Sequence, residues 1–143
     1  MSKNWRPATQ LVHGGTTRSQ HGETSEAIFL TSGYAYDSAE QAEARMAGKE
    51  PGFVYSRFGN PTVSMFQDRL AAIEGGEACI ATSSGMAAIL TTAMAHLQAG
   101  DHVVCSKSVF GATTQLFSSI LSRFGITTSY VAIADPKAWQ AAV

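Results

Sequence analysis

The sequence has few of the features that mark secreted, membrane-spanning or metal-binding proteins. Only 2 of its 143 residues are cysteines, Cys79 and Cys105, and both lie in apolar segments. We interpret them as small hydrophobic residues rather than as a disulfide or metal ligands. The start has no basic segment followed by an apolar core, and no apolar run approaches the length that spans a bilayer. We expect a cytoplasmic chain with no metal and no membrane contact.

Charge is also scarce, and neither sign dominates. Lysine and arginine total 10, aspartate and glutamate total 11, and the formal net charge is −1. Because no basic run is present, we expect no nucleic-acid partner. Charged residues make up 15% of the chain and hydrophobic residues 45%. This low charged share predicts that part of the surface is buried against another molecule.

Residues 1–60 show little helical or strand periodicity. One short helix is predicted over Ser38–Met46, with Asp37 or Ser38 as its cap. An irregular segment of this length is unusual inside a compact domain. Its apolar and aromatic residues are too many for a disordered tail, the alternative: Trp5, Leu11, Val12, Ile28, Phe29, Leu30, Tyr34, Tyr36, Phe53 and Tyr55. We expect an arm that contacts a neighbouring subunit.

From residue 61 to 143 the pattern changes to alternating helices and strands. The predicted order is a helix from Asn60-Pro61 to Gly75-Gly76 with Val63, Phe66, Leu70 and Ile73 as its apolar stripe, a strand at Ala78–Ala81, a helix at Gly85–Gln98, a strand at His102–Cys105, a helix around Leu116–Phe124, a strand at Ile126–Ala134, and a helix after Asp135-Pro136. This alternation predicts an α/β domain with a largely parallel sheet.

The segment Cys79–Ala88 predicts a strand, a small-residue turn and a helix start. One face of this helix is predicted to carry Leu90, Ala93, Met94 and Leu97. Free backbone N–H groups and the positive end of the helix dipole favour an anion here, phosphate above all. The alternative is an ordinary N-cap, since serine and threonine often cap helices.

Two further segments carry candidate binding residues. In an extended chain Tyr55 and Arg57 point the same way and could grip one anion, the alternative being a surface arginine beside a half-buried tyrosine. The loop Ser106–Gly111 follows a predicted strand, at the sheet edge where α/β proteins bind ligands. There Phe110 either lies against a flat ring whose phosphate sits at Gly85, or packs on the core.

Taken together, the segments Tyr55–Thr62, Ser83–Ala88 and Ser108–Thr113 resemble the pyridoxal-phosphate (PLP) enzymes of cysteine and methionine metabolism. The resemblance covers nearly the whole chain. It implies the N-terminal part of a fold-type I PLP-dependent transferase, with an irregular arm before the first βα units of a mostly parallel sheet. It also implies a homotetramer with active sites shared between subunits.

Within this family, three segments are most similar to the branch that replaces the succinyl group of O-succinyl-L-homoserine with sulfide, in methionine biosynthesis. They are Leu11–Gly15, Gly22–Ile28 and Ser108–Gly111. Other γ-replacement and γ-elimination enzymes of the family stay open as alternatives, since we expect the residues that grip the substrate carboxylates and the succinyl group to lie mostly outside these 143 residues.

The resemblance also implies roles for five residues toward pyridoxal 5'-phosphate. Tyr55 and Arg57 match the pair that reaches the phosphate held by a neighbouring subunit. Gly85 and Met86 match the backbone amides that hold this phosphate within their own subunit. Phe110 matches the aromatic residue stacked on the pyridine ring, where many relatives have tyrosine. Since Phe110 lacks a hydroxyl, it cannot take part in acid–base chemistry.

The Schiff-base lysine of the family lies further along, in a Ser-x-Thr-Lys context that this chain lacks. The lysines present are Lys3, Lys49, Lys107 and Lys137. Lys107 is nearest the inferred site, but it lies on the phosphate-side loop. We interpret Asp135 as a helix cap rather than as a cofactor ligand. We therefore expect part of a longer enzyme with no catalytic residue of its own. The alternative is a non-catalytic assembly or anion-binding segment.

Overall fold

The computed structural model describes residues 5–143, so Lys3 and the other residues of the first four lie outside the described residues. The chain forms two compact units, the first ending at Ala81 and the second running from Thr82 to Val143. Among the described residues, no helix combines the length and apolar character needed to cross a membrane.

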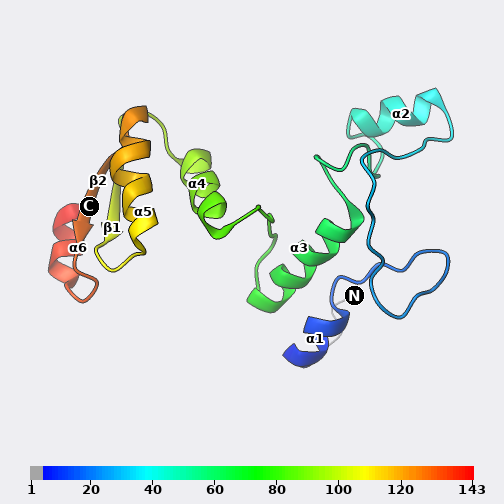
Figure 1. Ribbon diagram of the computed structural model, residues 1–143, viewed down its shortest axis with the longest axis horizontal. Helices are drawn as coiled ribbons and strands as arrows, with labels where there is room; N and C mark the ends of the chain where they lie inside the picture. Colours follow the sequence, from blue (N-terminus) through cyan, green and yellow to red (C-terminus); the bar gives the residue numbers. More distant parts are fainter. Residues whose placement is uncertain (1–4) are drawn as a thin grey trace. The chain divides into compact units, whose positions relative to one another are not determined.

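The first unit contains helices α1 (Pro7–His13), α2 (Ala39–Met46) and α3 (Pro61–Glu74), labelled in Figure 1. Two of these were predicted with their caps. Ser38 Oγ accepts the Gln41 N–H at 3.1 Å before α2, and Asn60 Oδ1 accepts the Thr62 N–H at 2.9 Å before α3. Helix α1, which packs against α3, was not predicted, because residues 1–60 were interpreted as largely irregular. Its local signal is weak, because only the proline at its first position marks a helix start.

The long segment between α1 and α2 is irregular, and Arg69 of α3 holds part of it in place. The Arg69 guanidinium donates to Gly14 O at 2.8 Å, to Glu26 Oε1 at 2.8 Å and to Thr16 Oγ1 at 3.2 Å. The Arg69 hydrogen bond lowers the pKa of Glu26. Further along, Leu30 is 95% exposed. Burial of this segment against a neighbouring subunit stays a prediction.

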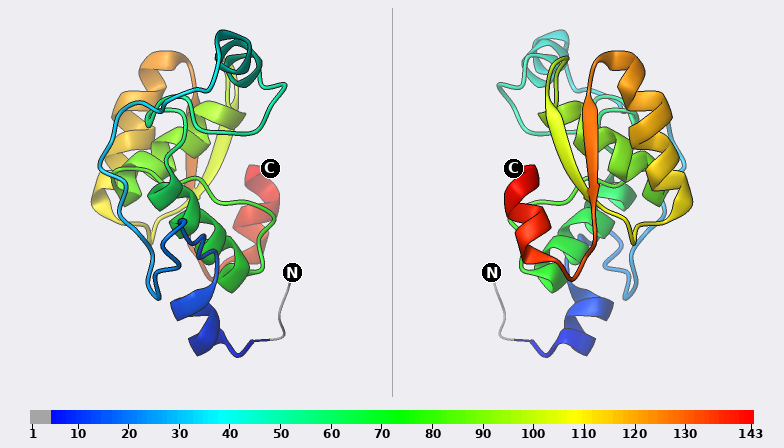
Figure 2. Two further views of the ribbon diagram at one scale, coloured as in Figure 1. Left: turned by 90° about the vertical axis from the view of Figure 1, so that its right-hand side faces the viewer. Right: turned by 90° about the vertical axis from the view of Figure 1, so that its left-hand side faces the viewer.

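The second unit contains α4 (Gly85–His96), β1 (His102–Ser106), β2 (Thr127–Val131) and α6 (Pro136–Ala142). A continuous helical segment joins the strands and consists of α5 (Gly111–Gln115), the π-helical η1 (Leu116–Ile120) and the 3₁₀ turn η2 (Leu121–Phe124). The two strands pair in parallel, with His102 opposite Thr127 and Ser106 opposite Val131. The helical segment and α6 lie on opposite sides of the strands (Figure 2). The predicted α/β architecture is confirmed.

The core of the second unit lies between α4, the helical segment and the start of β2. Its buried residues are Ala93, Leu116, Leu121 and Ile126, and Met86, Ile89, Leu97, Val103 and Phe117 pack against them. The π-helical turn brings Leu116 and Leu121, five residues apart, toward one face. The predicted face of α4 was partly wrong, since Leu90 and Met94 are exposed. Apolar residues surround α4 almost completely, so periodicity alone could not select the buried face.

The predicted strand at Ala78–Ala81 is wrong, because this segment has no regular structure. Ile80 is 77% exposed, and the Ala81 N–H donates to Gln67 Oε1 at 2.8 Å instead of to a strand. A strand needs a backbone partner, and within the described part of the chain β1 and β2 pair only with each other. The last predicted strand, Ile126–Ala134, is shorter and covers Thr127–Val131. Cys79 and Cys105 are both free thiols. Cys105 is buried in β1, and this burial raises the pKa of its thiol.

Replacing Asn60 with alanine is expected to lower the free energy of unfolding by about 2–4 kcal/mol. The residue is 8% exposed, and its Nδ2 donates to Phe29 O and to Ser56 Oγ, each at 3.0 Å. Alanine removes these bonds together with the cap of α3. Urea denaturation followed by fluorescence measures the loss.

Asn60→Asp is the matched control, because it keeps the capping oxygen and removes only the amide donors. Its stability should fall between those of Asn60→Ala and the unaltered protein. Equal stability of all three proteins would contradict the assigned contacts.

Candidate functional site

Tyr55 and Arg57 lie in a tight turn and not in an extended chain, so the predicted backbone was wrong here. The Phe58 N–H donates to Tyr55 O at 2.9 Å and closes the turn. The two side chains nevertheless share one side of it, since the Arg57 guanidinium carbon lies 5.5 Å from the centre of the Tyr55 ring. The same carbon lies 4.7 Å from the centre of the Phe58 ring. The turn therefore presents a cation in contact with two aromatic rings.

Ser56 anchors this turn to the preceding irregular segment. The Ser56 N–H donates to Ser32 O at 2.9 Å, and its hydroxyl donates to Thr31 O and accepts from Asn60 Nδ2. Tyr55 forms an isolated antiparallel bridge with Gly33. Both neighbours of Ser56, Tyr55 and Arg57, are exposed. Sequence reasoning assigned no role to Ser56.

Within the described part of the chain, the guanidinium of Arg57 has no acidic partner. Among residues 5–143, the ion pairs join Arg45 to Glu50 and Arg69 to Glu26, and none involves Arg57. An exposed arginine without a carboxylate is free to bind an anion in a bidentate manner. The phosphate of a ligand fits this residue.

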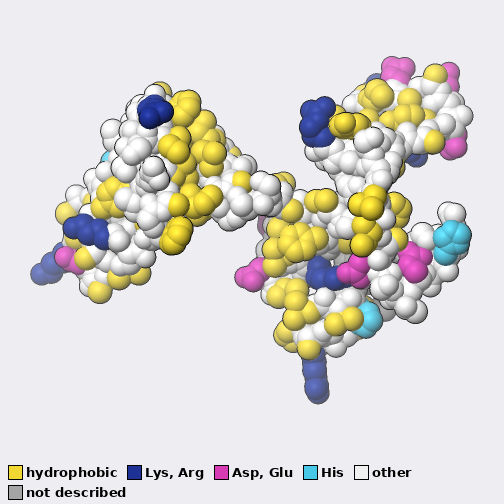
Figure 3. Space-filling view, in the orientation of Figure 1, with side chains coloured by type: hydrophobic (Ala, Val, Ile, Leu, Met, Phe, Trp, Pro, Cys, Tyr) yellow, Lys and Arg dark blue, Asp and Glu magenta, His cyan; other side chains and the backbone are white. Residues whose placement is uncertain are grey.

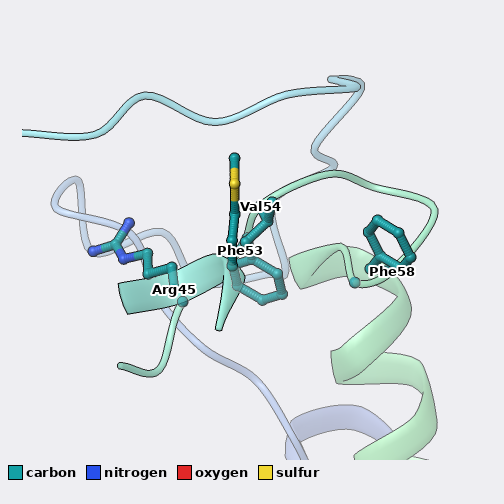
Figure 4. A pocket seen from close by; sticks show the side chains of 7 residues that line it. Arg45, Phe53, Val54 and Phe58 are labelled. Atoms are coloured by element: carbon teal, nitrogen blue, oxygen red, sulfur yellow. The ribbon is translucent and has the colours of Figure 1, made fainter. Parts of the chain in front are cut away.

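A cavity of about 560 Å³ lies beside the turn, and Figure 4 shows its labelled residues Arg45, Phe53, Val54 and Phe58. The remaining lining residues are Met46, Gly52 and Gly59. Glu50 lies 3.2 Å from Arg45 Nε and neutralises that charge. The cavity is therefore mainly apolar. Its arginine, Arg45, is already paired with Glu50, whereas Arg57 is available to an anion.

In the second unit, the start of α4 leaves two backbone donors free. Ser84 Oγ accepts the Ala87 N–H at 3.1 Å and Ser84 O accepts the Ala88 N–H at 3.0 Å. No acceptor among the described residues faces the N–H groups of Gly85 and Met86. The ordinary N-cap and the predicted anion-binding start therefore coexist in one helix.

Gly85 is not required by the fold of the unit itself. Its backbone φ is not positive, and a Cβ built on it would meet no atom within 4 Å. Glycine at such a position suits the close approach of a ligand to the backbone. Because the two free N–H groups and the bare glycine occur together, the start of α4 fits a bound phosphate group.

Phe110 precedes α5 and is 78% exposed, so it does not pack on the core. The start of α5 lies against α4, where Thr113 Oγ1 donates to Met86 Sδ at 3.8 Å. The Phe110 ring is therefore available to a ligand. Lys107 is exposed beyond the end of β1, and its N–H donates to Val131 O at 2.8 Å.

The structure distributes the five predicted residues over both units. Tyr55 and Arg57 belong to the first, while Gly85, Met86 and Phe110 belong to the second. Asp135 caps α6 by accepting the Ala138 N–H at 3.1 Å, as interpreted. Within the part of the chain that the structure describes, no cluster of three or more histidine, cysteine, aspartate or glutamate side chains could hold a metal ion.

Exposed hydrophobic side chains occur on both units (Figure 3). They include Ile28, Leu30 and Phe58 in the first unit and Leu90, Met94 and Phe110 in the second. Such exposure agrees with the low charged share of the sequence and with surfaces that contact other groups.

Comparison with known proteins gives one consistent family. The sequence model of the Cys/Met metabolism PLP-dependent enzymes matches residues 8–143. The chain is 49% identical over 134 residues to O-succinylhomoserine sulfhydrylase from Pseudomonas aeruginosa, covering 94% of this chain and 33% of that protein. It is 43% identical over 130 residues to L-methionine gamma-lyase from Fusobacterium nucleatum, covering 91% and 33%.

A solved structure from Campylobacter jejuni, described as an O-acetylhomoserine (thiol)-lyase, superposes with a TM-score of 0.91 at 32% identity. The match covers 98% of this chain and 35% of that one, which carries N'-pyridoxyl-lysine-5'-monophosphate. The chain thus spans about a third of the length of the relatives it matches.

Proposed function

This chain belongs to the family of Cys/Met metabolism PLP-dependent enzymes, and we propose that it forms the N-terminal third of an O-succinylhomoserine sulfhydrylase. The enzyme would replace the succinate of O-succinyl-L-homoserine by sulfide, breaking the Cγ–O bond, forming a Cγ–S bond and releasing homocysteine and succinate. The observation that carries the choice is the 49% identity to a sulfhydrylase of this specificity. In this proposal the enzyme is a cytoplasmic homotetramer, as the family resemblance implies.

The cofactor phosphate would be held by groups from two neighbouring subunits. The free N–H groups of Gly85 and Met86 donate to it at the positive end of α4. Arg57 and Tyr55 would reach it from a neighbouring subunit, where the Arg57 guanidinium would neutralise one of its charges and the Tyr55 hydroxyl would donate a hydrogen bond. When bound, PLP supplies the electron sink that accepts negative charge from the substrate Cα.

Phe110 would orient the cofactor ring by lying against one of its faces. The Phe110 side chain has no ionisable group, so its role would be to orient the cofactor ring and not to transfer protons. The proton transfers at the substrate carbons and the attachment of the cofactor would fall to the family's Schiff-base lysine, whose Ser-x-Thr-Lys context these 143 residues lack. We propose that these residues alone are inactive.

Two alternatives differ in what the enzyme does at Cγ. The 43% identity to L-methionine gamma-lyase favours elimination from methionine as the second candidate. The likeness to an O-acetylhomoserine (thiol)-lyase favours an acetyl rather than a succinyl leaving group. A non-catalytic assembly or anion-binding role is supported only by the missing lysine context.

Kinetics of the full-length enzyme separate these candidates. We expect kcat/KM for homocysteine formation from O-succinyl-L-homoserine and sulfide to exceed that for O-acetyl-L-homoserine at least about tenfold, the effect of one charge-assisted bond to the extra carboxylate. The 143-residue chain, tested beside it, should release no homocysteine. Faster release of 2-oxobutanoate from methionine would favour the lyase instead.

A further inference from the structure

Phe58 has an exposed ring that lies against the guanidinium of Arg57. The Phe58 residue is 75% exposed, so burial does not hold it in place. Its ring centre nevertheless lies 4.7 Å from the guanidinium carbon of Arg57, closer than the ring of Tyr55 at 5.5 Å. Separations of this size give a favourable cation–π contact.

The backbone fixes this arrangement. The N–H groups of Phe58 and Gly59 both donate to Tyr55 O, at 2.9 and 3.2 Å, and the buried Asn60 follows directly. Arg57 and Phe58 are therefore carried on a closed turn with a capped helix behind it. Their contact follows from the turn, and no ligand is needed to bring the two side chains together.

A ring holds an arginine differently from a carboxylate. An acidic partner would fix the side chain but would also compete with an incoming phosphate for the same N–H donors. An aromatic face restricts the rotamers of Arg57 and leaves its charge and its outer N–H edge available. Restricting a free side chain before binding lowers the entropy lost on binding.

We propose that Phe58 is a positioning residue that holds the Arg57 guanidinium ready for the cofactor phosphate. This inference rests on the proposed function, in which Arg57 binds that phosphate. Phe58 itself touches no reacting atom, so its effect passes through Arg57 alone.

The test measures PLP binding to the full-length apoenzyme by absorbance titration, without any assay of turnover. Phe58→Leu keeps an apolar side chain and removes the ring, and it should raise the Kd for PLP about two- to fivefold. Phe58→Trp restores an aromatic face and should bind PLP at least as tightly as the unaltered enzyme. Pyridoxal, which lacks the phosphate, should bind all three proteins equally.

A double-mutant cycle separates this inference from the proposed function. In an Arg57→Ala background, Phe58→Leu should have no further effect on the Kd for PLP. Suppose that Arg57→Ala weakens PLP binding, while Phe58→Leu either leaves it unchanged or weakens the binding of PLP and pyridoxal equally. The role of Phe58 is then wrong, and the phosphate site at Arg57 stands. If Arg57→Ala leaves PLP binding unchanged, both assignments fall. Weaker PLP binding by Phe58→Trp would also overturn the role of Phe58.

Discussion

Arg57→Ala is expected to weaken PLP binding to the full-length enzyme by about ten- to a hundredfold, the equivalent of roughly 1.5–3 kcal/mol for one charge-assisted bond to phosphate. The guanidinium is exposed, lacks an acidic partner among the described residues and lies over two rings. It is therefore available to the phosphate without breaking another ion pair. Equilibrium titration of the apoenzyme with PLP measures the change.

Two variants sharpen this result. Lys49→Ala removes an exposed cation of the same unit, outside the turn, and should leave the Kd unchanged. Arg57→Lys keeps the charge without the planar fork and should lie between alanine and arginine. At saturating PLP, Arg57→Ala should turn over nearly as fast as the parent enzyme. A variant that held PLP normally and yet lost turnover would show that Arg57 has another role.

The helix starts could be predicted because their signals are local. Ser38, Asn60 and Asp135 each accept an N–H two or three residues further along, so the capping residue and its partner stand together in the sequence. The starts of α2, α3 and α6 were therefore predicted correctly. The start of α1 was missed because no capping side chain precedes it.

The errors concern features set by distant residues. A strand at Ala78–Ala81 required a backbone partner that no local pattern can supply. The turn at Tyr55–Phe58 replaced an extended chain because Ser56 and Asn60 bond to a segment more than twenty residues earlier. The side chains of Tyr55 and Arg57 do lie on one side of the turn, as predicted. The reason given, alternation along an extended strand, was wrong.

Within the candidate site, Gly85 was easier to assign from the sequence than Phe58. Gly85 was predicted from its place at a helix start, and the structure shows that neither φ nor packing requires it. Phe58 could not be assigned from the sequence, since an aromatic residue next to an arginine is common and only the turn brings their side chains together. Family resemblance alone related the two units to one phosphate.

A phosphate bound by Arg57 of one subunit and by Gly85 and Met86 of a neighbouring subunit would make each active site composite. Arg57 belongs to a unit with strongly exposed apolar residues such as Leu30, while Gly85 and Met86 belong to the other unit. The resemblance implies that Tyr55 and Arg57 cross to a neighbouring subunit. Active sites would then be composite, with Arg57 from one subunit and the cofactor-binding lysine from the other.

Two full-length variants test this arrangement, Arg57→Ala and one that lacks the cofactor-binding lysine. At a PLP concentration below the Kd of Arg57→Ala, each variant alone should be nearly inactive. Mixed, unfolded and reassembled, they should recover roughly a quarter of the parent activity, because half of the random pairs are mixed and each has one intact site of two. Mixed oligomers are verified by pull-down of differently tagged subunits. If such oligomers form and no activity returns, each site is built within one chain, and the exposed apolar residues of the first unit need another partner.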